Sequence, residues 1–106
     1  MTDNEKIKIV RWMGLYKGWS DADMLKTFVD HIPDYSTDAE AVQLLNVLAE
    51  KGYGPGLLYN RGTPGGWYLL VFDGDVHHTG GYKPTIHEAI VAAVLEVIKR
   101  EQDGNQ

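Results

Sequence analysis

Two carboxylates and two imidazoles lie close together in the segment Asp73-Gly74-Asp75-Val76-His77-His78. A metal ion such as Zn²⁺ needs three or four nitrogen, oxygen or sulfur ligands that converge on one point. The Asp-Gly pair is also a strong signal for a two-residue hairpin turn, which places both histidines on a strand. Because adjacent strand residues point to opposite faces, His77 and His78 cannot both bind one metal ion. We therefore expect a polar hairpin here and no metal site.

A glycine-rich segment, residues 80–85, leads directly into an expected helix N-terminus, where an anion could bind. Unpaired N–H groups and the helix dipole favour negative charge at such a position, and Lys83 adds a positive charge. The capping residue Glu88 would occupy part of this site. The connector at residues 60–66 is less suited, since the Walker pattern requires a Lys-Ser/Thr pair before a helix and a strand follows here. The residues predicted to bind a small anion such as a nucleotide are Gly80, Gly81, Tyr82, Lys83, Thr85 and Arg61.

The remaining histidines do not belong to a recognisable catalytic pattern. His87 falls in the first turn of an expected helix, and no Ser, Asp or Cys pattern points to it. His31 lies beside Asp30 in a segment of uncertain structure. The sequence shows no nucleophile–base pair, no paired carboxylates and no zinc signature. We therefore expect no catalytic residues, no cofactor and no enzymatic activity.

Aromatic residues gather near the end of the expected first helix, at Trp12, Tyr16 and Trp19. Packing of this helix onto a core accounts readily for Trp12. Tyr16 and Trp19 are left over, and aromatic side chains are enriched in the energetic centres of interfaces. The sequence therefore predicts an interface role for Tyr16 and Trp19.

The candidate residues are positioned by helices whose starts the sequence marks. Two Thr-x-x-Glu segments, Thr37 to Glu40 and Thr85 to Glu88, each precede apolar residues at helical spacing, as in a capping box. They predict helices over about 37–51 and 85–100. A first helix is expected from Asp3 or Asn4 to about Gly14. For residues 15–36 a helical turn and a short strand both remain open.

Three strands are expected between the last two helices, at residues 56–60, 66–72 and 76–82. Alternation gives the central strand two apolar faces, one with Leu69 and Val71 and the other with Leu70 and Phe72. Such a strand is buried on both sides, by helices or by a partner subunit. The predicted fold is α+β: a three-layer α/β/α sandwich with a three-stranded antiparallel meander and about three helices, in the order α-α-β-β-β-α. We expect one domain over residues 1–106, with a frayed tail from about residue 101.

The composition of the chain disfavours several classes of binding partner. The 106 residues carry a net charge of -5 with a pI near 5.2, which disfavours a nucleic-acid binder that relies on phosphate neutralisation. The chain has no cysteine, which excludes disulfides and thiolate metal sites and fits a reducing compartment. No segment approaches the roughly 20 apolar residues of a membrane helix, so we expect a cytoplasmic protein without membrane contact.

The order of these elements resembles the small phage ABA sandwich proteins of bacteriophages and prophages. The resemblance is carried by residues 32–38, by Ala41, Leu44 and Leu45, by Gly66-Trp67-Tyr68 with Phe72, and by residues 88–95. It implies an accessory protein in the cytoplasm of a bacterial host and no particular activity. We therefore predict a non-enzymatic interaction module that binds a host protein or forms a homo-oligomer. The alternative is a protein that sequesters a small anionic ligand such as a nucleotide.

Overall fold

The chain forms two compact units, Met1–Asp34 and Tyr35–Gln106, in a computed structural model that describes residues 1–104. It is an α+β protein, and its described part contains four α-helices and a three-stranded antiparallel sheet. Each unit is described by itself below, and the expectation of one domain stays a prediction. None of the helices within residues 1–104 has the length and apolar character needed to cross a bilayer.

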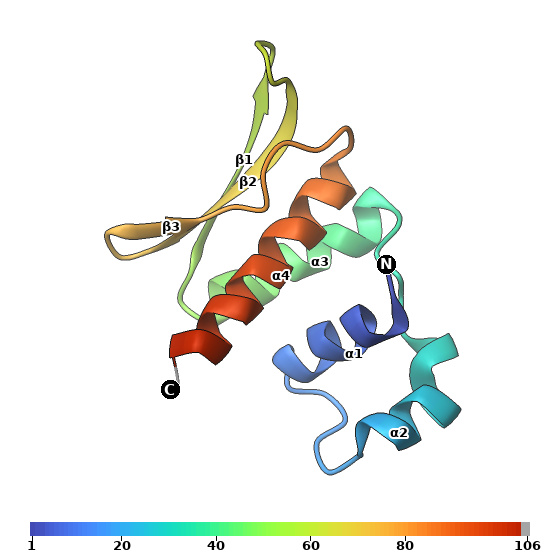
Figure 1. Cartoon of the computed structure of the whole chain (residues 1–106). Coiled ribbons are helices and arrows are strands. Elements are labelled where there is room, and N and C mark those ends of the chain that lie inside the picture. Colours follow the sequence, from blue (N-terminus) through green and yellow to red (C-terminus); the bar gives the residue numbers. More distant parts are fainter. Residues whose placement is uncertain (105–106) are drawn as a thin grey trace. The chain divides into compact units, whose positions relative to one another are not determined.

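The first unit is helical throughout its ordered elements. Helix α1 (Asp3–Trp12) is followed by α2 (Asp21–Asp23), the π-helical turn η1 (Met24–Phe28) and the 3-10 turn η2 (Val29–His31) (Figure 1). Of the two alternatives for residues 15–36, the helical one is correct over residues 21–31, and no strand forms there. Its core cluster consists of Ile7, Val10, Met24 and Ile32, with Tyr16 packed against it.

The cap of α1 corrects the expected start at Asp3 or Asn4. The N-cap is Thr2, whose hydroxyl accepts from the Glu5 backbone N–H at 3.2 Å while the Glu5 carboxylate accepts from the Thr2 N–H at 2.9 Å. This is a third Thr-x-x-Glu segment in the chain, and it forms both reciprocal hydrogen bonds of a capping box, whereas Glu40 and Glu88 accept from the threonine hydroxyls. It escapes a search for apolar periodicity because four charged residues, Glu5, Lys6, Lys8 and Arg11, interrupt the run.

The second unit contains the two helices whose starts the sequence marks. Helix α3 (Asp38–Glu50) begins after Thr37, and α4 (Ile86–Gly104) begins after Thr85; each threonine hydroxyl accepts from a glutamate N–H three residues on, at 3.3 Å. The predicted starts are therefore confirmed. Residues 101–104 continue α4, while the rest of the expected frayed tail, residues 105–106, lies outside the described residues.

The sheet is the expected meander, with strands β1 (Gly54–Asn60), β2 (Gly66–Asp73) and β3 (Val76–His78) in the order β1-β2-β3. The third strand is shorter than predicted, since it ends at His78 instead of residue 82. The chain then leaves the ladder and returns to β2 only at Lys83, which forms an isolated antiparallel bridge with Trp67.

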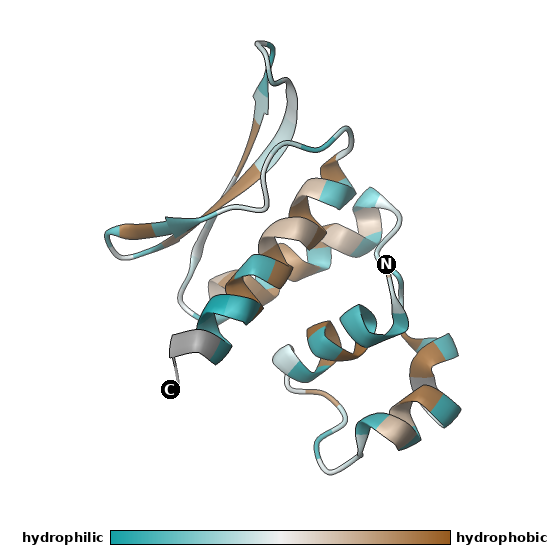
Figure 2. Ribbon diagram, viewed as in Figure 1, coloured by the Kyte–Doolittle hydropathy of each residue, from teal (hydrophilic) through white to brown (hydrophobic). Residues whose placement is uncertain are grey.

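The helices of this unit cover one face of the sheet. Leu69 and Val71 are fully buried, and α3 and α4 pack against each other and against the strands (Figure 1). Apolar residues follow the first part of α4 and the middle of β2, whereas α4 becomes hydrophilic toward its C-terminal end (Figure 2). On the opposite face Phe72 is 47% exposed and Leu70 is half-buried. The predicted burial of β2 on both sides is therefore not achieved by the helices of this unit.

Replacing Thr37 or Thr85 by Ala should lower the free energy of unfolding by about 0.5–2 kcal/mol, because each hydroxyl satisfies a helix N–H that would otherwise lack a protein partner. Urea denaturation measures the effect. Thr27→Ala is the matched control, since Thr27 is exposed and caps no helix. Denaturation midpoints of the two cap variants equal to that of the parent would contradict this role.

Candidate functional site

The predicted anion site at the start of α4 is already occupied by a side chain of the protein. The backbone N–H of His87 donates to Asp38 Oδ1 at 3.2 Å, and His87 Nδ1 lies 3.1 Å from the same oxygen. The next N–H, of Glu88, donates to Thr85. Because Asp38 opens α3, this carboxylate joins the N-terminal ends of both helices. Anion binding by residues of this segment stays a prediction, and two of the N–H groups it would use are taken.

The glycines of the segment allow close backbone approach. A Cβ on Gly80 would lie 2.4 Å from the Cβ of Ala92 in α4. A Cβ on Gly66 would lie 2.7 Å from the carbonyl oxygen of Lys83, whose N–H donates to Trp67 at 2.7 Å. Gly81 has a φ of 89°, a conformation that favours glycine. The glycine-rich sequence therefore has a packing role whether or not a ligand binds.

The other predicted ligand residues lie on different parts of the unit. The Tyr82 ring packs edge-on against Tyr68, with centroids 4.9 Å apart. Arg61 is exposed in the connector between β1 and β2. The structure brings Lys83 next to Gly66, the first residue of β2, while Thr85 is held by the cap of α4.

A contiguous apolar surface lies on the side of the sheet away from the helices. This outer face comprises Leu58, Tyr68, Leu70, Phe72 and Tyr82. Leu58 is 44% exposed, Phe72 47% and Tyr82 41%. The residues of β1 opposite Leu70 and Phe72 are Gly56 and Gly54, which contribute no side chains to cover them. The His77 ring lies beside Phe72, with centroids 6.2 Å apart.

The two aromatic residues predicted for an interface differ in their surroundings. Tyr16 packs against the core cluster of the first unit and adopts a φ of 56°. Trp19 is 44% exposed, and its carbonyl accepts from the Arg11 guanidinium, which also pairs with Asp21 at 2.9 Å. Packing against the core cluster therefore explains part of the burial of the Tyr16 side chain. The interface role of Tyr16 and Trp19 stays a prediction.

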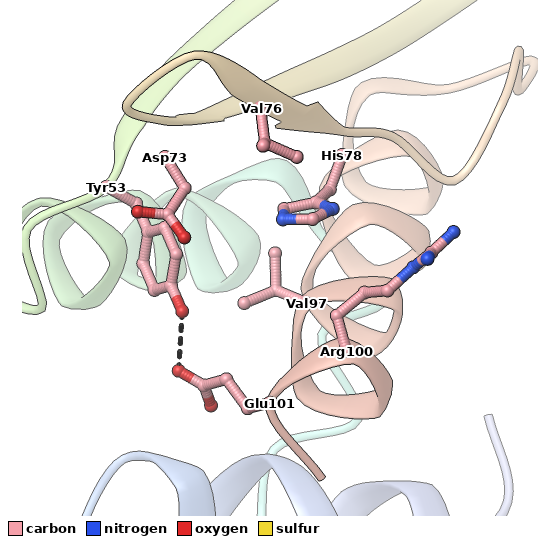
Figure 3. Close-up of a pocket in the computed structure, with 7 residues that line it drawn as sticks. All are labelled: Tyr53, Asp73, Val76, His78, Val97, Arg100 and Glu101. Carbon is pink, nitrogen blue, oxygen red and sulfur yellow. Dashed lines mark hydrogen bonds between the residues drawn. The ribbon is translucent and has the colours of Figure 1, made fainter. Parts of the chain in front are cut away.

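A polar pocket lies where the β2–β3 hairpin extends over the C-terminal half of α4 (Figure 3). Its volume is about 210 Å³, and its lining residues are Tyr53, Asp73, Val76, His78, Val97, Arg100 and Glu101. The register explains the hairpin's contribution: Asp73 pairs with Val76 and Val71 pairs with His78, so these side chains share the face of the buried Val71.

The strand register also separates the two neighbouring histidines. His78 lines the pocket on the helix side, whereas His77 pairs with Phe72 on the outer face. The prediction that they point to opposite faces is therefore confirmed. Among the side chains that the structure describes, which stop short of Asp103, no group of three or more His, Asp or Glu is arranged to hold a metal ion.

One strong hydrogen bond joins two of the residues that line the pocket. The Tyr53 hydroxyl donates to Glu101 Oε1 at 2.7 Å. Burial, the hydrogen bond and the negative charges of Glu101 and Asp73 all raise the pKa of Tyr53, so its phenol stays protonated. The sequence analysis singled out Asp73 and His78 but missed Tyr53, Arg100 and Glu101. No local signal marks these three, because Tyr53 lies between α3 and β1 while Arg100 and Glu101 lie on α4, and only tertiary packing brings them together.

The comparisons with known proteins identify no relative. No family model matches the chain, and no curated protein and no solved structure matches it either. The resemblance to phage ABA sandwich proteins therefore stays a prediction, and functional proposals rest on the geometry of the outer face and the pocket.

Gly80→Ala should destabilise the protein by about 1–3 kcal/mol, because the new methyl group would overlap Ala92 and force α4 away from the chain after β3. Gly62→Ala is the control, since its Cβ would meet only the Asn60 side chain, at 3.6 Å. Urea denaturation of both variants tests the packing role. Equal losses in the two variants would show that Gly80 is not under steric constraint.

The raised pKa of Tyr53 predicts a loss of stability at alkaline pH. An unfolded tyrosine ionises near pH 10, whereas the folded phenol stays protonated there, so the free energy of unfolding should fall above about pH 10. Below that pH the stabilisation is complete. In Tyr53→Phe the free energy of unfolding should decline less steeply between about pH 9 and 11. Some decline should persist, because burial also raises the pKa of Tyr35. Identical slopes for parent and variant would rule this out.

Proposed function

We propose that this protein is a non-enzymatic interaction module that self-associates through the outer face of its sheet. The observation that carries the proposal is the exposure of Leu58 and Phe72 on one continuous surface. Single exposed apolar side chains are normal on a soluble protein, whereas contiguous ones mark contact sites. Here Leu58 lies directly opposite Tyr68, and the Tyr68 ring contacts Tyr82. The patch is therefore continuous across neighbouring segments.

A second copy of the chain is the occupant that fits the charge of this surface. In a two-fold contact the same patch meets itself, so any charge at its centre would face a like charge. The five apolar side chains of the outer face are uncharged, with His77 beside Phe72 at its β3 side, although the chain as a whole carries a net charge of -5. Acidic groups elsewhere oppose random approach of two copies, while this face avoids that repulsion. Face-to-face stacking would also supply the third layer that the apolar strand β2 predicts.

The size of the face sets the strength of the contact. With about 3.3 Å per residue and 4.8 Å between strands, a three-stranded surface the length of β1 covers roughly 300 Å². A stable interface buries about 800 Å² on each partner. We therefore propose a weak, concentration-dependent dimer. An accessory role in phage or prophage biology rests on the resemblance of the sequence elements alone.

Sedimentation equilibrium from low to high micromolar concentration tests the proposal. The parent protein should shift from monomer toward dimer, and Leu58→Lys and Phe72→Lys should each remain monomeric, because lysines would be desolvated or face each other across the contact. Both positions are about half exposed, so the folded unit should tolerate them. Val42→Lys is the matched control: Val42 is 45% exposed on α3, away from the outer face, and should leave dimerisation unchanged.

Each alternative outcome identifies another occupant. A parent protein that stays monomeric at high micromolar concentration overturns self-association. Cover of the face by residues 1–34 or by a different protein would then replace it. Dimerisation that survives both lysine variants but is lost in Val42→Lys would move the contact to the helical side of the unit.

A further inference from the structure

The polar groups of the pocket under the hairpin are divided by charge. Figure 3 shows Tyr53, Asp73 and Glu101 toward one side, with His78 and Arg100 toward the other. Val97 lies between the two groups, and Val76 lies above it. Acidic oxygens and basic nitrogens therefore lie on opposite sides of these apolar contacts, and the Arg100 guanidinium is directed away from Val97 (Figure 3).

Several of these groups have hydrogen-bonding capacity that the protein does not use. Tyr53 and Glu101 satisfy each other. Among the side chains that the structure describes, those of Asp73 and His78 form no hydrogen bond, and Arg100 uses only its Nε, toward Glu96 at 3.3 Å. The terminal nitrogens of Arg100 and both oxygens of Asp73 thus remain available to a ligand.

The arrangement selects a ligand with two opposite charges. A carboxylate forms charge-assisted hydrogen bonds with an ammonium group, and a guanidinium binds a carboxylate through two parallel N–H donors. The volume of about 210 Å³ lies below the range of roughly 300–1,000 Å³ of pockets for drug-sized ligands. This volume matches a small zwitterion better than it matches a nucleotide.

We propose that this pocket binds a free α-amino acid, with its ammonium group toward Asp73 and Glu101 and its carboxylate toward Arg100 and His78. The side chain would contact Val76 and Val97. The pocket lies on the helix side of the sheet, whereas self-association uses the outer face. Either proposal can therefore fail without affecting the other.

The test is titration of the isotope-labelled full chain, followed by NMR of its backbone amides. The probes are L-alanine, ethylamine, which carries only the ammonium group, and propionate, which carries only the carboxylate. L-alanine should shift amides of residues 73–78 and 97–101, with a dissociation constant on the order of 1 mM for a ligand of this size. Ethylamine and propionate should each bind at least about tenfold more weakly, since each loses one charged contact.

Two variants connect the binding to the charged groups. Asp73→Asn and Arg100→Gln should each weaken L-alanine binding about tenfold or more, and both positions are exposed, so the fold should persist. Asp75→Asn and Lys99→Gln are the matched controls, because each removes the same charge from a neighbouring residue that does not line the pocket.

Three results would overturn the proposal. One is the absence of shifts at residues 73–78 and 97–101 with L-alanine at tens of millimolar, roughly ten times the expected dissociation constant. Another is equal binding of ethylamine and L-alanine, which would make the pocket a site for cations only. The third is equal weakening by the lining variants and their controls, which would reduce the effect to the overall charge of the surface.

Discussion

The packing of α4 on β2 is the interaction on which the second unit depends. The buried side of this helix carries Ala89 and Ala93 among larger residues, and the small side chains let its backbone come close to the sheet. The same closeness is visible at Ala92, where the chain after β3 passes so near that only glycine fits at position 80. By burying Leu69 and Val71, this contact decides which face of the sheet is the inner one.

The pocket and the outer face both result from the packing of α4 on only one face of the sheet. The β2–β3 hairpin runs past the main core, so its inward residues Asp73 and His78 meet the polar end of α4 instead of its apolar middle. A pocket with charged walls results. The outward residues of the same strands receive no helix from this unit, and the apolar outer face results. One sheet thus produces a polar site and an apolar site on opposite sides because helix α4 changes character along its length (Figure 2).

The parts of the structure that the sequence predicts are those set by short-range interactions. A threonine and a glutamate three residues apart make the caps of α3 and α4, and Asp73-Gly74 makes the hairpin turn, so each signal lies within a few residues. Tyr53 and Glu101 are separated by 48 positions, and no local pattern links them. Likewise, apolar residues on both faces of β2 predict that both faces are buried. They do not show whether a helix of the same chain or another molecule buries each face.

The composition of β1 limits how copies of this chain can assemble. β1 is an edge strand, and it contains Gly54, Pro55 and Gly56 in succession. Proline has no N–H to offer a neighbouring strand, and glycines make a strand edge less regular, so addition of a further strand at this edge is disfavoured. If two copies stack through the outer face as proposed, an edge at β1 that resists strand addition would favour a closed pair over continued growth into fibres.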